Sequence, residues 1–189
     1  GRVLALEAGR AGYDVVIHHH QSAEEAEGVA EEVRGLGRHA VTAAADLADA
    51  ASLSALTRAA ISLGPLTLLI NNASLFLDDA VGALKPDLFD AHQAINLRAP
   101  VLLAEALAAA LPTGKRGLVV NIIDQRVLRP DPSFFSYALS KAGLHWATQT
   151  LAQALAPMVR VNGIGPGPTL PSIHQAPGEF EAEAQASLL

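Results

Sequence analysis

A tyrosine and a lysine four residues apart, Tyr137 and Lys141, are the first residues whose types and spacing suggest chemistry. In a helix, residues at i and i+4 share a face, so both side chains can point into one cleft. An ammonium beside a phenol favours phenolate, which lowers the tyrosine pKa from about 10. Such a phenol can exchange a proton near neutral pH, as a reductase requires. Taken alone, the pair is more often a packed tyrosine and a solvated lysine.

A carboxylate, Asp124, ends the apolar run 117–123 and precedes Tyr137 by thirteen residues. A carboxyl group near Tyr137 can relay a proton and can accept a hydrogen bond from a ring N–H. The alternative is that Asp124 is simply a polar residue at the end of a strand.

The elements that must position these residues alternate along the chain between helical and strand patterns. Helices are expected over 1–10, 22–36 (N-cap Ser22), 49–62 (N-cap Asp49), 86–111 with a bend near Pro100, and 134–156; strands are expected over 13–17, 39–45, 66–70, 118–123 and 159–162. Residues 165–171 are expected to be irregular and 178–189 to form a weak helix. Strands that are apolar on both faces and alternate with helices predict a single α/β domain over 1–189: a doubly wound parallel sheet in a three-layer αβα arrangement.

Polar or glycine-rich residues follow each predicted strand. They are His20-Gln21-Ser22, Asp46-Leu47, Asn71 to Ser74, Asp124, and Gly165-Pro166-Gly167. In parallel sheets, ligands bind beyond the carboxyl ends of the strands. Five such ends in register predict a long polar cofactor lying along that edge.

These motifs together resemble those of the short-chain dehydrogenase/reductase family. The matching features are Asn71-Asn72-Ala73, Asn96, Tyr137 with Lys141, and the segment Val161 to Gly167, in the family's order and spacing. The resemblance implies a Rossmann fold, a nicotinamide cofactor and a Tyr–Lys–Asn catalytic set. It also implies a first strand and a glycine-rich loop before Gly1 and a last strand after Leu189, so we expect an incomplete domain, truncated at both ends.

Four features resemble the pteridine reductases and the bacterial dihydromonapterin reductases in particular. Asp124 replaces the serine of most family members, and Asn72 to Phe76 (NASLF), His18 to Ser22 (HHHQS) and Gly163 to Gly167 (GIGPG) resemble their segments. The departure is Gln21, where those enzymes have an arginine.

The resemblance implies a role for each site residue. Tyr137 would be the proton donor, assisted by Asp124; Lys141 would lower its pKa and bind the nicotinamide ribose, and Asn96 would hold a water. Phe76 would stack on the substrate and Ser74 would contact it, although Phe76 could be a core residue and Ser74 could serve only the loop. The expected reaction is NADPH-dependent reduction of a C=N bond in a pterin-like substrate.

The cofactor is expected to be NADP(H), because the strand that ends before His20 is followed by no carboxylate that would repel a 2′-phosphate. The cofactor-binding residues implied by the resemblance are Gly1, His20, Gln21, Ser22, Asp46, Leu47, Asn72, Ala73, Tyr137, Lys141, Pro166, Gly167 and Thr169.

Composition excludes several other classes of function. The net charge of −6 without a basic run argues against nucleic acid or an anionic membrane as partner. No cysteine is present, so disulfides and thiolate chemistry are excluded, and three adjacent histidines without further ligands do not predict a metal site. No apolar run reaches membrane-spanning length. We expect a cytoplasmic homodimer or homotetramer.

Two other functions stay open. One is a short-chain reductase of a ketone, a 3-oxoacyl thioester or a quinone. The other is a non-catalytic family member that binds nucleotide.

Overall fold

The computed structural model describes residues 1–167, 178, 181, 182 and 185 of the 189-residue chain. Thr169 and most of the segments 165–171 and 178–189 therefore lie outside the described residues. All described strands are parallel, as predicted. They are β1 (Val15–His19), β2 (Ala40–Ala44), β3 (Leu68–Asn71), β4 (Gly117–Ile122) and β5 (Val159–Ile164).

The described strands form two parallel sheets. β1 pairs with β2, and β3, β4 and β5 form a second sheet in that order. A cavity of about 1450 Å³ lies between them, lined along its length by residues of β1 and β3. The chain is α/β with a doubly wound arrangement, and this cavity interrupts the sheet.

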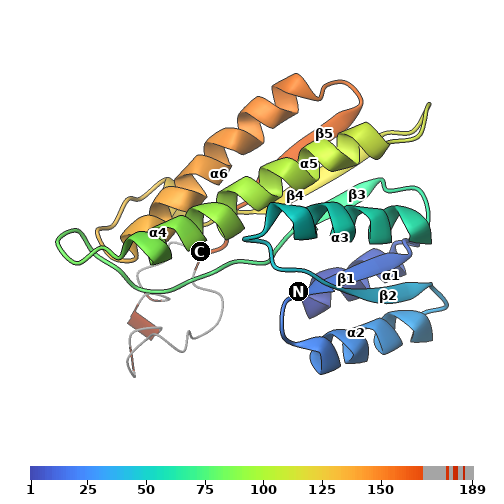
Figure 1. Cartoon of the computed structure of the whole chain (residues 1–189), viewed down its shortest axis with the longest axis horizontal. Helices are drawn as coiled ribbons and strands as arrows, with labels where there is room; N and C mark the ends of the chain where they lie inside the picture. Colours follow the sequence, from blue (N-terminus) through green and yellow to red (C-terminus); the bar gives the residue numbers. More distant parts are fainter. Residues whose placement is uncertain (168–177, 179–180, 183–184, 186–189) are drawn as a thin grey trace.

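Helices cover the strands (Figure 1). They are α1 (Arg2–Arg10), α2 (Ala23–Gly35), α3 (Ala50–Leu63), α4 (Pro86–Gln93), α5 (Ala99–Ala110) and α6 (Phe135–Ala154), with a π-helix η1 (Ala94–Arg98) between α4 and α5 and a 3₁₀ turn η2 (Gln125–Val127) after β4. α1 and α2 lie together against β1, while α3, α5 and α6 lie side by side along the other part of the molecule.

The helix ends follow from the sequence to different degrees. Asp49 caps α3 as predicted, because its carboxylate accepts hydrogen bonds from the backbone N–H groups of Ala51 and Ser52. Ser22 occupies the N-cap position of α2 but makes no side-chain cap bond. The long helical segment predicted over 86–111 is helical from 86 to 110. It is interrupted by the π-helix just before Pro100, and π-helical turns of this kind often occur at functional sites.

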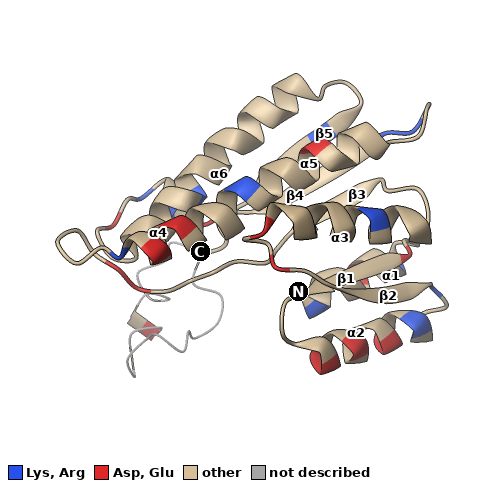
Figure 2. Ribbon diagram, in the orientation of Figure 1, with Lys and Arg blue, Asp and Glu red and all other residues tan. Residues whose placement is uncertain are grey.

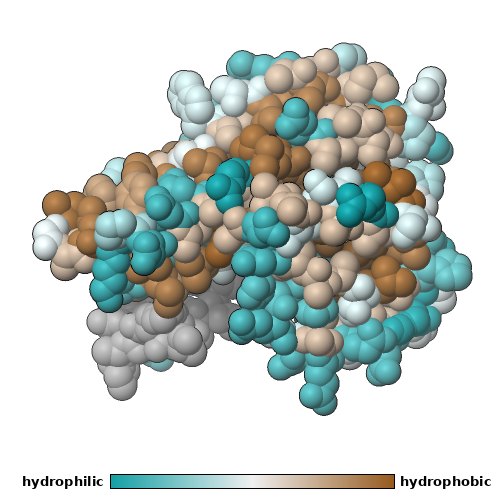
Figure 3. All heavy atoms as spheres, viewed as in Figure 1, coloured by the Kyte–Doolittle hydropathy of each residue, from teal (hydrophilic) through white to brown (hydrophobic). Residues whose placement is uncertain are grey.

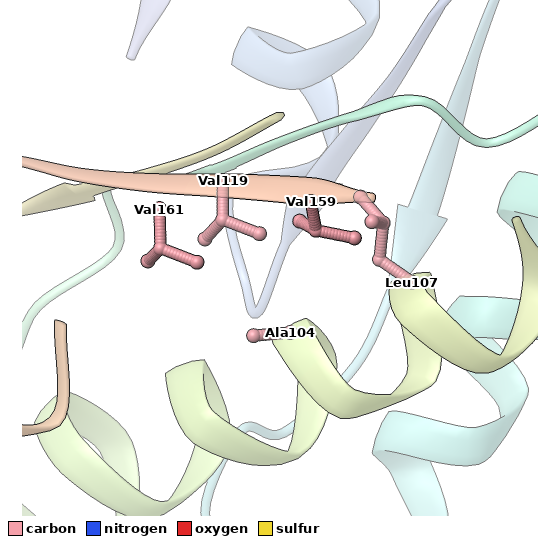
Figure 4. Packing of buried hydrophobic residues seen from close by; sticks show 5 residues of the cluster. All are labelled: Ala104, Leu107, Val119, Val159 and Val161. Atoms are coloured by element: carbon pink, nitrogen blue, oxygen red, sulfur yellow. The ribbon is translucent and has the colours of Figure 1, made fainter. Parts of the chain in front are cut away.

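The largest apolar core joins α5 to the second sheet. Ala104 and Leu107 of α5 meet Val119, Val159 and Val161, which point toward the helix from β4 and β5 (Figure 4). Alternate residues of β4 are buried, as expected where one face of a strand packs on helices. This packing fixes β4, whose carboxyl end leads to Asp124.

A buried chain of polar side chains crosses the same core. Nδ2 of Asn71 donates to Oδ1 of Asn121 at 2.7 Å, and Nδ2 of Asn121 donates to Oγ1 of Thr148 at 2.9 Å. Thr148 in turn donates to the carbonyl of Leu144 at 2.7 Å. Since buried polar groups are costly unless they are paired, this ladder fixes the register of β3, β4 and α6.

Basic and acidic residues are both spread over the elements seen in Figure 2. Acidic residues gather on α2, where the surface is hydrophilic, whereas hydrophobic residues reach the surface along α5 (Figure 3). In the described part of the chain, no helix combines the length and the apolar character needed to cross a bilayer.

Candidate active site

Tyr137 and Asp124 are in direct contact. The Tyr137 hydroxyl, in the first turn of α6, donates a hydrogen bond to Oδ2 of Asp124 at 2.8 Å. Asp124 follows β4, and its Oδ1 accepts from the backbone N–H of Arg126 at 2.8 Å, so the turn η2 orients the carboxylate. Tyr137 and Asp124, which the spacing predicted to lie close together, are therefore joined by a hydrogen bond between the start of α6 and the end of β4.

The electrostatics of Tyr137 differ from the prediction. Burial raises the pKa of Tyr137 well above its ordinary value; the negative charge of Asp124 and the hydrogen bond to it raise this pKa further. Arg126 is the cation that opposes the shift. The expectation that Lys141 lowers the pKa of Tyr137 is wrong in this structure, because burial and the carboxylate dominate. The phenol is held in its protonated form and is suited to donate a proton.

Lys141 is buried one helical turn after Tyr137. Its Nζ donates to the carbonyl of Ile122 at 2.9 Å and lies 5.7 Å from the centroid of the Tyr137 ring. Burial lowers the pKa of Lys141 to about 8, against the opposing influence of Asp124. A cation held at this depth, beside the end of β4, is placed to bind an oxygen-rich ligand.

Asn96, in the π-helix, ties two parts of the site together. Its Oδ1 accepts from the backbone N–H of Leu75 at 2.8 Å and from Oγ of Ser74 at 3.2 Å. Its Nδ2 donates to the Leu75 carbonyl at 2.9 Å and to Oγ of Ser140 at 3.1 Å. An asparagine side chain can make four such bonds, and all four are made here. A water at Asn96, as predicted, would therefore have to bind its backbone carbonyl.

Aromatic rings gather beside the Tyr137 hydroxyl. Phe76 stacks on Phe134 with ring centroids 4.3 Å apart and planes inclined by 14°, and it meets Tyr137 edge-on at 4.6 Å. Arg126 lies over both phenylalanine rings, 5.8 Å and 5.3 Å from their centroids. Phe76 is thus in the site, as predicted, but Phe134 covers one of its faces.

The predicted cofactor residues fall into two groups. The cavity between β1 and β3 brings together Gly1, His20, Gln21, Ser22, Leu47, Asn72, Ala73 and Ser74. Gly1 lies so close to Asn72 that a Cβ added to it would be 3.4 Å from Nδ2 of Asn72. Asp46 is not in this lining, and its Oδ1 accepts from the backbone N–H of Ala48 at 2.8 Å.

The second group approaches the catalytic residues from β5. The backbone N–H of Gln125 donates to the carbonyl of Pro166 at 3.2 Å, and a Cβ on Gly167 would lie 3.3 Å from Oε1 of Gln125. Tyr137, Lys141 and Asp124 do not line the large cavity. These three residues gather at the carboxyl end of β4, one strand away from the cavity.

The chain matches the family model described as short chain dehydrogenase over residues 1–181. It belongs to the short-chain dehydrogenase family. The FolM alternative dihydrofolate reductase 1 of Brucella canis, crystallised with NADP, is 47% identical, with a TM-score of 0.91 over 98% of this chain and 74% of that chain. A short chain dehydrogenase of Burkholderia cenocepacia, also crystallised with NADP, is 35% identical, with a TM-score of 0.86 over 98% of this chain and 76% of that one.

A curated relative differs in its named activity. The 3-oxoacyl-[acyl-carrier-protein] reductase FabG of Staphylococcus aureus is 28% identical over 88% of this chain and 69% of its own length.

Several residues of this short-chain dehydrogenase that sequence reasoning missed lie at the site. Arg126 follows Asp124 by two residues, so the spacing of opposite charges could have indicated it. Phe134 precedes α6 with a left-handed backbone, φ 51°, which is uncommon for a residue other than glycine. His19 has a buried Nδ1 without a hydrogen-bond partner among the described residues, at the end of β1. No local pattern indicates Phe134, whereas His19 lies in the segment 18–22 that the resemblance had singled out.

Proposed function

We propose that the protein is an NADPH-dependent reductase of a C=N bond in a pterin-like substrate. The observation that carries the proposal is the 2.8 Å hydrogen bond from the Tyr137 hydroxyl to the Asp124 carboxylate. A carbonyl reductase needs a neutral donor to hold the carbonyl oxygen, and a carboxylate is poorly suited to that task. A ring N–H, in contrast, is a good partner for a carboxylate.

The nicotinamide cofactor supplies a hydride to the ring carbon when it is bound. Tyr137 delivers a proton to the adjacent ring nitrogen, since its pKa is raised and its phenol is protonated. Asp124 accepts a hydrogen bond from a substrate N–H. After the transfer, a proton from solvent passes through the Asp124 carboxylate to the tyrosine oxygen and restores the phenol. Lys141, a buried amine one helical turn from Tyr137, would bind the nicotinamide ribose.

NADP(H) is the proposed cofactor because the residues present fit its phosphate. His20, Gln21 and Ser22 line the cavity at the end of β1, carry no negative charge and can donate hydrogen bonds. The two NADP-bound relatives described above agree with this choice. Gly1, Asn72 and Ala73 would approach the cofactor with their backbone, and Thr169 is proposed from the sequence alone.

The aromatic group supports a flat substrate. Phe76 and Phe134 stack next to the Tyr137 hydroxyl, and a conjugated ring can stack in the same manner. The name of the Brucella canis relative refers to reduction of dihydrofolate, which contains a pterin. Ser74 would contact the ring with its hydroxyl.

The test is NADPH oxidation by the full-length protein with three dihydropterins: dihydrobiopterin, dihydromonapterin and dihydrofolate. A panel of ketones and a 3-oxoacyl thioester serves as comparison, because the Staphylococcus aureus relative carries that activity in its name. We expect kcat/KM for at least one pterin to exceed that for every carbonyl compound. Turnover of carbonyl compounds without turnover of any pterin would contradict the proposal. NADPH binding without any turnover would favour a non-catalytic nucleotide-binding function.

Homo-oligomers are also proposed. Trp146 and Leu139 of α6 are 70% and 46% exposed, and Leu102 of α5 is 36% exposed. Large apolar side chains gathered on neighbouring helices are typical of a protein interface. Analytical ultracentrifugation of the wild type and a Trp146→Glu variant tests this, and an unchanged monomeric mass in both would contradict it.

A further inference from the structure

Three buried polar side chains next to the aromatic group have no part in the chemistry described above. They are Asp79, which follows the Phe76 loop; His92, near the end of α4; and Ser136, in the first turn of α6. Asp79 is 7% exposed, and His92 and Ser136 are fully buried. Buried groups of this kind are costly unless they are paired, so their arrangement calls for a physical account.

The three side chains form one continuous hydrogen-bonded chain with a single consistent direction. The Ser136 hydroxyl donates to Oδ2 of Asp79, so it must accept from Nδ1 of His92, which lies 2.6 Å away. A neutral imidazole that carries its proton on Nδ1 presents Nε2 as an acceptor, and the backbone N–H of Leu77 donates to it at 3.4 Å. Burial lowers the pKa of His92, against the influence of Asp79, which agrees with the neutral ring.

Asp79 also caps the helix that carries the catalytic pair. Its Oδ1 accepts from the backbone N–H of Ser136 at 2.9 Å, and its carbonyl accepts from the backbone N–H of Phe135 at 3.1 Å. Asp79 is 57 residues from Ser136 in sequence, so the N-terminus of α6 is capped from a distant loop rather than from its own chain. The left-handed Phe134 at this helix start is held in part by the same interactions, because Asp78 accepts from its N–H at 3.3 Å.

The network meets the site at two points in the sequence. Leu77 follows Phe76, and Ser136 precedes Tyr137. The His92 ring also meets the Tyr137 ring edge-on, with centroids 6.1 Å apart. The network thus connects the aromatic loop, α4 and the start of α6 around the phenol.

We propose that Asp79, His92 and Ser136 are positioning residues that fix the Tyr137 hydroxyl against Asp124 and the Phe76 loop. They touch no reacting atom and act through the start of α6. The proposal rests on the proposed function only in that Tyr137 is the proton donor.

The first test is Ser136→Ala, which removes the central hydroxyl and little volume. A displaced proton donor reduces turnover more than binding, so we expect kcat to fall roughly tenfold while KM for NADPH stays unchanged. In a Tyr137→Phe background the same substitution should have no further effect on kcat, because the group that it positions is gone. Ser52→Ala is the matched control: the Ser52 hydroxyl donates to Asp49 in a similar cap on α3, at 2.8 Å. That variant should keep the wild-type kcat.

A second measurement does not depend on turnover. The chain has two tyrosines, so in a Tyr13→Phe background tyrosinate absorbance reports Tyr137 alone. Ser136→Ala should lower the pH at which Tyr137 ionises, since the phenol is held less firmly in its buried contact with Asp124. Asp79→Asn, which reverses the direction of the bond to Ser136, should do the same and serves if Ser136→Ala does not fold.

The outcomes separate this proposal from the proposed function. If the wild type reduces no substrate, the reductase proposal fails, and the tyrosine titration still decides the role of the network. The network proposal is overturned if Ser136→Ala and Asp79→Asn lose stability but leave the Tyr137 titration as in the wild type. An equal loss of kcat with and without the Tyr137 hydroxyl would also overturn it.

Discussion

The Tyr137 hydroxyl and the Asp124 carboxylate meet at 2.8 Å, the first from the start of α6 and the second from the end of β4. Burial, together with this contact, raises the pKa of the tyrosine, which the nearby Lys141 was expected to lower. A protonated phenol next to a carboxylate forms a short proton relay, and reduction of a C=N bond consumes one proton for each hydride transferred.

Replacement of Asp124 by asparagine tests the relay. Asp124→Asn keeps an acceptor in place but removes the negative charge, so the pKa of Tyr137 should fall toward its ordinary value. The kcat for pterin reduction should fall roughly 10²-fold because the carboxylate can no longer relay a proton. Tyrosinate absorbance in a Tyr13→Phe background and steady-state kinetics measure the two effects. Asp131→Asn, which changes an exposed carboxylate of the following loop, is the control; a Tyr137 titration that does not move in Asp124→Asn would refute the assignment.

Replacement of Phe76 by leucine tests the stacking role. Phe76→Leu keeps an apolar side chain but removes a ring, and an aromatic pair contributes about 1 kcal/mol beyond its buried area. We expect KM for the dihydropterin to rise by roughly fivefold, with KM for NADPH unchanged as an internal control. If KM rises equally for both substrates, Phe76 supports the fold of the loop rather than the substrate.

The buried Lys141 makes stability depend on pH in a defined direction. Its pKa is about 8 in the folded chain and 10.5 in the unfolded reference, so between these values the unfolded state binds more protons. Below about pH 8 the buried side chain is charged, and this burial lowers the free energy of unfolding by its full amount. The free energy of unfolding then rises as the pH increases from about 8 toward 10.5. The gain approaches about 3 kcal/mol.

Chemical denaturation of the wild type and Lys141→Met at a series of pH values measures this effect. As the pH rises from about 8 to 10, the free energy of unfolding of the wild type should increase relative to that of Lys141→Met. The other titrating groups are the same in both proteins, so their contributions cancel in this difference. A difference that stays constant over this range would show that Lys141 is charged in the folded protein throughout.

Local features of the fold could be predicted from the sequence, and features set by distant contacts could not. The cap at Asp49 was predicted because its partners are two and three residues away. The π-helix at 94–98 was missed because Asn96 is held by Leu75 and Ser140, which no local pattern connects to it. The sheet was predicted as parallel from apolar strands alternating with helices, and all described strands are parallel.

In the candidate site, too, contacts that follow from sequence spacing were predicted, whereas effects of the surrounding structure were not. The contact between Tyr137 and Asp124 was predicted from a family spacing. The direction of the Tyr137 pKa shift was wrong because Lys141 is a neighbour in sequence, whereas burial depends on the surrounding structure. The cap of α6 by Asp79 could not be predicted from the sequence, because 57 residues separate Asp79 from Ser136.

The buried ladder of Asn71, Asn121 and Thr148 gives a last prediction, about stability rather than activity. Thr148→Val keeps the shape of the side chain but removes the acceptor for Nδ2 of Asn121, which is fully buried. A buried donor left without a partner costs about 1–3 kcal/mol, and the free energy of unfolding should fall by that amount.

The control is Thr150→Val on the same helix. The Thr150 hydroxyl is exposed and donates only within α6, to the carbonyls of Trp146 and Ala147, so this change should stay within about 0.5 kcal/mol. Urea denaturation of both variants measures the difference. Equal losses in the two variants would mean that Asn121 finds another acceptor and that the ladder does not hold β4 to α6.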